Sequence, residues 1–301
     1  NDDAGKVRNR AAHPVERLLQ IDPGHPGLRC RRARQTLRSR PRFDDGVPQG
    51  RPVHEDGYRD RRQAGAASRQ RPETLLCGFQ VAGLLIRRFL FEKEQGKELE
   101  VFNDRDSNLI NLYRCIKYHC GELQRELEWL TISREQFFDS KSQLDSQGLT
   151  DIQRAARFFH IIKVSFGSDR RTFGTNKKNL ANAIEYLPLI QKRLQGVVIE
   201  NKDFENLIRV YDRPGALFYL DPPYHGTEKY YEGSFTEADH ERLKAVLSSI
   251  KGRFILSYND DTYVRELYKG YNIEEISRNN SLAGKTKTSQ FKELIIRNYE
   301  K

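Results

Sequence analysis

The stretch Leu217–Tyr224, with the sequence LFYLDPPY, joins an apolar run to a rigid polar end. A continuous apolar run of this length is typical of a strand that is buried on both faces of a parallel sheet. The run stops at an acid, two prolines and an aromatic ring: Asp221, Pro222, Pro223 and Tyr224. In open α/β sheets, ligands bind beyond the carboxyl ends of the strands. We therefore expect these four residues to lie at a ligand site.

Strands and helices alternate on both sides of this stretch. We expect strands over 98–102, 197–201, 215–221, 253–258, 271–277 and 292–299. We expect helices between them over 203–211, 236–251 and 260–270. The second of these helices opens on Thr236 with Asp239 three residues later, which is typical of a helix N-cap. Strands that alternate with helices of this length predict an α/β sheet with parallel strands.

Residues 106–195 are mostly helical by the spacing of their apolar side chains. We expect helices over 106–119, 121–130, 134–140, 151–166 and 180–195. A loop rich in Gly, Arg, Thr and Asn interrupts the block at 167–179. The block would form an insertion or a second lobe, and the sheet domain would consist of residues 89–105 and 196–301.

The first 88 residues differ in composition from the rest of the chain. They contain 19 Lys and Arg against 10 Asp and Glu, whereas the remaining 213 residues contain 33 against 32. The excess positive charge of the chain therefore lies almost entirely in this segment. Because 18 of its 19 basic residues are Arg and no period of 2 or 3.6 is sustained, we expect an irregular or disordered segment.

Three explanations of residues 1–88 are open on the sequence alone. The segment could be a basic arm that binds nucleic acid, or a poorly structured linker. We favour a third explanation, a displaced reading frame or another sequence error, with normal sequence resuming near Phe89–Lys93. The abrupt change in Arg and Lys usage at that point supports this hypothesis, and the nucleotide sequence around codon 88 would test it.

Cysteine spacing and hydropathy exclude several classes of protein. The cysteines at 30, 77, 115 and 120 show neither CxxC spacing nor a cluster with His, so we expect neither a disulfide framework nor a metal site. No apolar run approaches the roughly 20 residues of a membrane helix, and no signal peptide is recognisable. We expect a cytoplasmic monomer that does not bind membranes.

The tetrapeptide Asp221–Tyr224 can hold a flat ring that carries an amino group. Two consecutive prolines fix two φ angles at about −65° and remove two N–H donors. The Pro222 carbonyl therefore lies on a stiff segment. The Asp221 carboxylate and this carbonyl can accept the amino hydrogens while Tyr224 stacks on the ring. The alternative is a proline-rich turn with Tyr224 packed against a neighbour. The apolar strand directly before the acid favours the ligand site.

The sequence Asp221–Tyr224 is a DPPY motif, and residues 89–299 resemble the Dam-like, class D12 DNA adenine-N6 methyltransferases of bacteria and phages. The segments that carry the resemblance are, in order, EVFNDRDSNLINLYR, RAARFFHIIKVSFG, NKDFENLI, LFYLDPPYHGTEKYY, GSFTEADHERL, RFILSYND, VRELYKGYNI and KELIIRNY. The resemblance implies a Rossmann-like sheet with a helical target-recognition region at 106–195. It also implies a site-specific methyltransferase of the restriction–modification or phage kind that acts on double-stranded DNA.

The resemblance implies S-adenosylmethionine as cofactor and assigns residues to it. Asp104 would accept hydrogen bonds from the ribose hydroxyls, as acids at strand ends do in nucleotide-binding sheets. Asp104 could also cap the helix that follows it. Asp203 and Phe204 would hold the adenine of the cofactor by a hydrogen bond and an apolar contact. Lys6, which follows Gly5, is what remains of a Gly-Gly-Lys segment of the family.

On the substrate side, the resemblance implies an adenine flipped out of the duplex. Asp221 and the Pro222 carbonyl would accept the hydrogens of its N6 amine, and Tyr224 would stack on its ring. Two acceptors favour a pyramidal nitrogen whose lone pair points at the methyl group. Transfer is then an in-line displacement driven by positioning and electrostatics, without a metal or a covalent enzyme intermediate.

The loop GSDRRTFGTNKK offers side chains for DNA contacts. They are Arg170, Arg171, Asn176, Lys177 and Lys178. This mixture suits phosphate binding and readout of base edges, and the resemblance places a target-recognition region in this part of the chain. A solvated charged face is the alternative.

One part of the family pattern is missing. A glycine-rich motif of the EPFxGG kind should fall just before Phe91, where this chain reads CGFQVAGLLIRRFLF. Bulky residues follow Gly83, although close approach of backbone to a charged ligand favours glycine. An alternative function is therefore a catalytically inactive DNA-binding remnant. Methyl transfer to RNA or to a protein glutamine is disfavoured, because such enzymes more often carry Asn in place of Asp221.

Overall fold

The fold is seen in a computed structural model, which describes residues 73–78, 98–166, 170–175, 179–226, 235–279 and 290–300. Most of residues 1–88, including Lys6 and the positions where the family carries its Gly-Gly-Lys segment, lie outside the described residues. The predicted DNA contacts Asn176, Lys177 and Lys178 also lie outside them.

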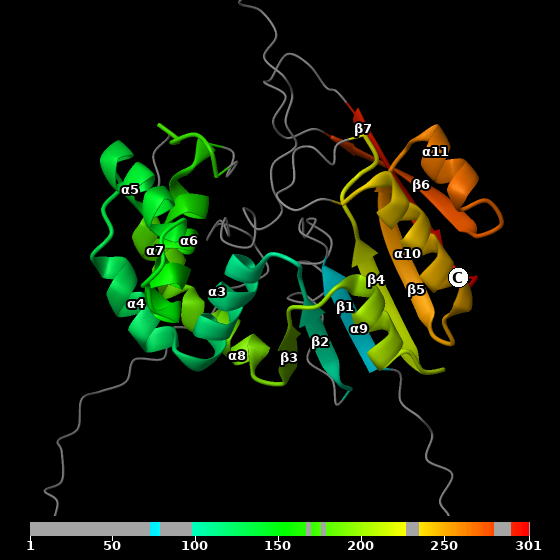
Figure 1. The fold of residues 1–301 in the computed structure, drawn as a ribbon, viewed down its shortest axis with the longest axis horizontal. Helices are drawn as coiled ribbons and strands as arrows, with labels where there is room; N and C mark the ends of the chain where they lie inside the picture. The colour runs from blue at the N-terminus through cyan, green and yellow to red at the C-terminus, as the bar shows by residue number, and fades with distance from the viewer. Residues whose placement is uncertain are drawn as a thin grey trace, which may run out of the picture. The chain divides into compact units, whose positions relative to one another are not determined.

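In the described residues, seven strands form one sheet in the order β3-β2-β1-β4-β5-β7-β6 (Figure 1). Their bounds are β1 Glu73–Gly78, β2 Glu100–Asn103, β3 Val197–Glu200, β4 Ala216–Asp221, β5 Arg253–Asn259, β6 Asn272–Asn279 and β7 Gln290–Arg297. The strands β1 to β5 pair in parallel, as the alternation of strands and helices predicted.

The last strand departs from the parallel arrangement predicted for the sheet. It runs antiparallel to both neighbours, β5 and β6. Only residues 280–289 separate β6 from β7. A parallel crossover needs a dozen residues or more and usually a helix, so this short connection favours an antiparallel pair.

The prediction that residues 1–88 are irregular is wrong for Glu73–Gly78. These residues form β1 at the centre of the sheet, where residue 75 pairs with Val101 of β2 on one side and with Phe218 of β4 on the other. An apolar run as short as TLLC shows no period of its own. Pairing with strands that lie far along the chain stabilises it, so the sheet domain begins upstream of residue 89.

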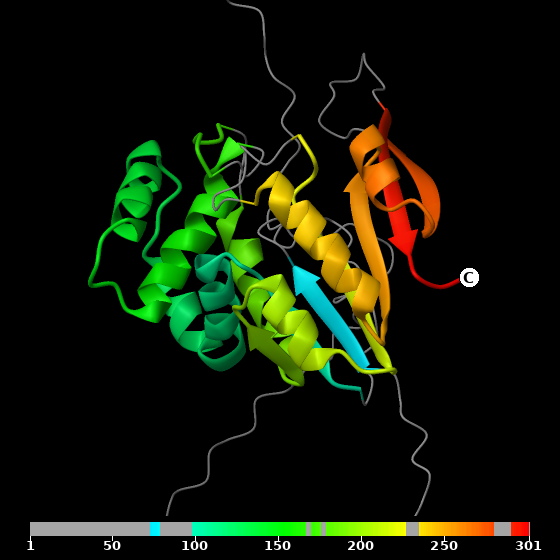
Figure 2. The same ribbon diagram turned by 45° about the vertical axis from the view of Figure 1, so that its right-hand side comes forward.

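Side chains of the central strands alternate between two cores, one on each face of the sheet. Val101, Phe218 and Leu220 pack with the helices α9 (Phe204–Tyr211) and α10 (Glu237–Ser249). Phe102 and Tyr219 pack with the helical block on the other face. Burial of both faces explains the continuous apolar run before Asp221. Figure 2 shows α9 and α10 over the same face, and the short helix α11 (Thr262–Leu267) follows β5.

The helical block between β2 and β3 contains six helices in the described residues. They are α3 Ser107–Tyr118, α4 Cys120–Glu128, α5 Arg134–Leu144, α6 Asp151–Val164, α7 Leu180–Glu185 and α8 Leu187–Leu194. The helix predicted over 180–195 is two helices, because Pro188 lacks an N–H and its ring excludes the regular bond to the preceding turn. A buried bidentate ion pair between Arg193 of α8 and Glu100 of β2, at 2.7 and 2.9 Å, ties the block to the sheet.

Candidate active site

The strand register brings the carboxyl ends of β2, β1 and β4 to one edge of the sheet. Residue 77 of β1 pairs with Asn103 of β2, and residue 78 pairs with Asp221 of β4. Asp104 is the first residue after β2, and Asp221 is the last residue of β4. Two acids from distant parts of the sequence therefore lie at the same edge, separated by one strand.

Asp221 is buried, with 3% of its surface exposed. The hydroxyl of Ser257 on β5 donates to its Oδ1 atom at 2.6 Å. The prolines at 222 and 223 are also buried, so the backbone that leaves β4 is enclosed as well as stiff. Ser257 was not singled out from the sequence, although it lies in the segment RFILSYND.

Tyr224 lies between two further residues that the sequence did not single out. Its hydroxyl donates to Oε1 of Glu293 on β7 at 3.2 Å. Its ring lies 6.4 Å from that of Tyr258 on β5, and the Tyr258 hydroxyl lies 2.6 Å from Nδ1 of the buried His240. Tyr224 is thus held at both its hydroxyl and its ring. Glu293 and Tyr258 lie in the quoted segments KELIIRNY and RFILSYND, but a single strand does not show which neighbour it meets.

Asp104 is fully buried and only partly satisfied by hydrogen bonds. Its Oδ1 atom accepts from the backbone N–H of Asp106 at 2.8 Å, and its Oδ2 atom has no hydrogen-bond partner among the described residues. Burial, together with the nearby charge of Asp106, raises the pKa of Asp104 to about 8. The alternative role as a helix cap belongs to Asp106, whose side chain accepts from the N–H groups of Asn108 and Leu109 at the start of α3.

Amide side chains fix the backbone between β2 and α9. Asn201 donates from Nδ2 to the Asp104 carbonyl at 2.8 Å. Asn103 donates to the Lys202 carbonyl at 3.1 Å and accepts from the Lys202 N–H at 2.8 Å. These bonds hold the backbone at Asp104 next to the start of α9.

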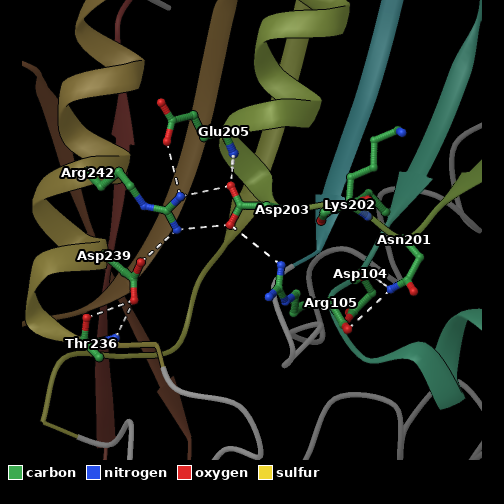
Figure 3. Close-up of polar contacts among 10 residues, drawn as sticks. Asp104, Arg105, Asn201, Lys202, Asp203, Glu205, Thr236, Asp239 and Arg242 are labelled. Atoms are coloured by element: carbon green, nitrogen blue, oxygen red, sulfur yellow. Dashed lines mark hydrogen bonds and ion pairs between the residues drawn. The ribbon is translucent and has the colours of Figure 1, made fainter.

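Asp203 caps α9, Phe204 begins it, and both contact Arg242 of α10. Figure 3 shows the contact between Asp203 and Arg242. Asp203 caps α9 by accepting from the Glu205 N–H at 3.0 Å. Its carboxylate also forms a bidentate pair with Arg242, at 3.0 Å for each oxygen. Phe204 is buried, and the Arg242 guanidinium lies 4.2 Å from the centre of its ring. The sequence did not single out Arg242.

The two arginines of the predicted DNA loop that the structure describes differ in their surroundings. Arg170 donates to Oδ2 of Asp106 at 2.9 Å, and only 13% of its side chain is exposed. Its guanidinium also lies 5.6 Å from the ring centre of Phe158. Arg171 is exposed. Arg170 is therefore largely shielded from solvent and paired with Asp106, and Arg171 is exposed.

Two further observations concern metals and membranes. In the described residues, no group of three or more His, Cys, Asp and Glu side chains is arranged to hold a metal ion. The same part of the chain contains no helix with the length and apolar character needed to cross a membrane.

The sheet is parallel apart from β7, is covered by helices on both faces and carries acids at the carboxyl ends of β2 and β4. It is a Rossmann-like fold of the methyltransferase kind. A protein-family model described as D12 class N6 adenine-specific DNA methyltransferase matches residues 88–282. The chain belongs to this family, which confirms the resemblance inferred from the DPPY motif and its neighbouring segments.

A curated relative and a solved structure are similar to this chain. The Type II methyltransferase M1.LlaDCHI of Lactococcus lactis subsp. cremoris is 28% identical over 236 residues, which cover 68% of this chain and 81% of that protein. The rRNA methyltransferase aviRa from Streptomyces viridochromogenes matches 76% of this chain and 77% of its own, at 14% identity and a TM-score of 0.32. The structural match is too weak to support the fold or the activity. Family membership and the curated relative support DNA methylation.

Proposed function

We propose that this protein transfers a methyl group from S-adenosylmethionine to N6 of an adenine flipped out of duplex DNA. The observation that carries the proposal is the buried Asp221, followed by two buried prolines and held by Ser257 at the sheet edge where Asp104 also lies. The ends of β2 and β4 are two strand spacings apart, about 10 Å. This is the scale of a nucleoside-sized ligand lying across the end of β1.

The residues at this edge are suited to the proposed cofactor. S-adenosylmethionine supplies, when bound, an electrophilic methyl group on a sulfonium. The Oδ2 atom of Asp104, which has no hydrogen-bond partner among the described residues, can bond to a ribose hydroxyl, as donor while the carboxyl group is protonated and as acceptor once it is ionised. This bond compensates for the burial of the carboxyl group. Asp203 and Phe204 can hold the adenine ring of the cofactor. Lys6 completes the proposed set, although it lies outside the described residues.

The residues around Asp221 hold and orient the target amine. Asp221 and the Pro222 carbonyl accept its two hydrogens, which favours a pyramidal N6 with its lone pair directed at the methyl group. Ser257 fixes the Asp221 carboxylate, and Tyr224 stacks on the base while Glu293 holds its hydroxyl. As N6 gains the methyl group it becomes positively charged. Asp221 stabilises that charge, and the nitrogen then loses a proton.

DNA contacts are proposed for the loop around residues 170–178. Arg171 is exposed in the described part of this loop, as are Thr172 and Thr175. We propose that Arg171 contacts phosphate together with Asn176, Lys177 and Lys178. The ion pair between Arg170 and Asp106 favours a structural role for Arg170, in which it orders the loop next to α3.

An inactive DNA-binding remnant is the second candidate, and one observation favours it. Because residue 78 pairs with Asp221, β1 ends beside the proposed site. The sequence that follows β1, which lies outside the described residues, reads FQVAGLLIRRF and has a single glycine. Bulky residues follow that glycine, although close approach of backbone to a charged ligand favours glycine. The remnant would bind DNA without binding the cofactor.

A methylation assay separates the candidates. Purified protein is incubated with labelled S-adenosylmethionine and plasmid DNA, and the DNA is digested and analysed for N6-methyladenine. We expect the labelled product, and we expect Asp221→Ala to abolish it while the affinity for S-adenosylhomocysteine is unchanged. DNA binding without cofactor binding would instead support the inactive remnant. Label in RNA or protein alone, or full methylation by Asp221→Ala, would overturn the proposal.

A further inference from the structure

The guanidinium of Arg242 lies at the centre of a cluster of three carboxylates. It contacts Asp203 at 3.0 Å, Glu205 at 3.2 Å and Asp239 at 2.8 Å. Figure 3 shows the three carboxylates around Arg242. Burial lowers the pKa of Arg242, but its hydrogen bonds to Asp203 and Asp239 outweigh burial and raise the pKa above its usual value. Without this cation, three like charges would lie close together at the start of α9.

Among the described residues, hydrogen bonds leave one acceptor position open on the Asp203 carboxylate. A carboxylate has about four lone-pair positions, two on each oxygen. Oδ1 accepts from the Glu205 N–H and from Nη1 of Arg242, each at 3.0 Å. Oδ2 accepts from Nη2 of Arg242, and Arg105 is the nearest other cation in the part of the chain that the structure describes, 3.9 Å away. One position on Oδ2 therefore remains for a donor, and its direction is set by the planar fork of Arg242.

Arg242 also positions Phe204. Its guanidinium lies 4.2 Å from the centre of that ring, which is a favourable cation–π distance. The centre of the Phe204 ring also lies 6.1 Å from that of Phe235. Asp203 and Phe204 are consecutive in the chain, and one side chain of a different helix holds both of them.

The helix that carries Arg242 follows the DPPY motif in the chain. Residues 227–234 connect Gly226 to the segment that opens α10, where Thr236 donates its backbone N–H to Asp239 at 2.8 Å. Asp239 in turn accepts from Arg242. A chain of contacts thus runs from the start of α10 to the start of α9.

We propose that Arg242 is a positioning residue for the adenine of the cofactor. It holds Asp203 so that the open position on Oδ2 accepts a hydrogen bond from the exocyclic amine, and it holds the Phe204 ring against the base. The inference rests on the cofactor roles proposed above for Asp203 and Phe204. Arg242 acts through these residues and does not take part in methyl transfer.

The test compares two ligands that differ only in the exocyclic amine. They are S-adenosylhomocysteine and its analogue in which a purine without the amine replaces adenine, and their affinities are measured by calorimetry. The variants are Arg242→Gln, Arg242→Lys and the matched control Arg209→Gln. Arg209 also contacts Glu205, but 71% of its side chain is exposed, so its ion pair contributes little. Thermal unfolding of each variant without ligand checks that it is folded.

We expect wild type to bind the ligand with the amine more tightly than the ligand without it. Arg242→Gln should lose most of that preference and bind S-adenosylhomocysteine roughly tenfold more weakly. Arg242→Lys, which keeps the charge but not the fork, should retain part of the preference, and Arg209→Gln should retain all of it. If Arg242→Gln weakens both ligands equally, or neither, the inference is wrong while the proposed function stands. If Arg242→Gln does not fold, the affinities of Arg242→Lys for the two ligands decide instead: an equal loss for both ligands, or no loss, would contradict the inference. Failure of wild type to bind S-adenosylhomocysteine would overturn both.

Discussion

Each of the three carboxylates of the candidate site accepts a hydrogen bond from a fixed donor inside the protein. Asp221 accepts from Ser257, Asp203 from Arg242, and Asp104 from the backbone of Asp106. A fixed donor orients the carboxylate before a ligand arrives, so less orientational freedom is lost on binding. At the scale of the residue, the site is therefore defined as much by these donors as by the acids.

The hydrogen bond from Ser257 should matter for catalysis more than for cofactor binding. Ser257→Ala removes a bond to a carboxylate, and we expect kcat to fall about tenfold while the affinity for S-adenosylhomocysteine is unchanged. Steady-state methylation kinetics and calorimetry measure the two effects. Ser249→Ala is the matched control, because Ser249 bonds only to the Val246 carbonyl of its own helix among the described contacts. An unchanged kcat in Ser257→Ala would argue against the orienting role.

The buried carboxyl group of Asp104 predicts a dependence of stability on pH. Its pKa is raised to about 8 from 3.8. Between these values the folded protein keeps a proton that the unfolded chain releases, so this contribution to stability is complete below about pH 4. It falls as pH rises, by up to about 1.4 kcal/mol per pH unit, until about pH 8.

Asp104→Asn removes this titration. The free energy of unfolding of the variant, relative to wild type, should therefore increase from pH 5 to pH 8 and level off above that. Denaturant unfolding at a series of pH values measures it. If the difference in the free energy of unfolding between Asp104→Asn and wild type does not change with pH, then Asp104 is ionised in the folded protein.

At the scale of the element, capping and close backbone packing set where strands and helices start. Asp106 caps α3 and Asp203 caps α9, which places both acids at the carboxyl edge of the sheet. At the opposite edge, Gly252 leads into β5. Its N–H donates to Asp212 at 2.9 Å, and a β-carbon at this position would lie 2.8 Å from the Ala216 carbonyl.

Gly252→Ala should destabilise the protein by about 1–3 kcal/mol, because the new methyl group meets backbone that begins β4 and cannot move aside easily. Thermal or denaturant unfolding measures the change. Gly121→Ala is the control, since a β-carbon there meets nothing within 4 Å at the start of α4. The control should be neutral or stabilise the protein by up to about 1 kcal/mol. Equal effects of the two substitutions would contradict the close approach.

At the scale of the whole molecule, β1 joins the two halves of the sheet. It pairs with β2, which leads into the helical block, and with β4, which carries Asp221. Without it, two neighbouring strands would expose unpaired backbone in the middle of the sheet. The segment around residues 73–78 is therefore required for the fold, although its composition did not predict it.

Two truncated chains test this requirement. A chain of residues 71–301 keeps β1, and a chain of residues 89–301 lacks it. We expect the first to unfold cooperatively with a near-UV circular dichroism signal, and the second to show neither property. The two differ only in residues 71–88, so each controls for the loss of the preceding segment. Cooperative unfolding of both at the same temperature would indicate that the sheet forms without β1.

The sequence by itself determined most elements and the strand that ends at Asp221. Helical spacing, the Thr236–Asp239 cap and the apolar run before Asp221 are local patterns, and they predicted most helix and strand positions. Local patterns suffice there because a helix period or a turn depends on residues a few positions apart. The glycine-rich motif of the family is not recognisable in the sequence before Phe91.

Only the tertiary structure decided which residues support the site. Ser257 lies 36 positions from Asp221, Arg242 lies 39 positions from Asp203, and Arg170 lies 64 positions from Asp106. No local period relates residues so far apart, and the pairing of β1 between β2 and β4 is equally non-local. These contacts arise when the chain folds and strands meet in register, so they could not be read from a single sequence.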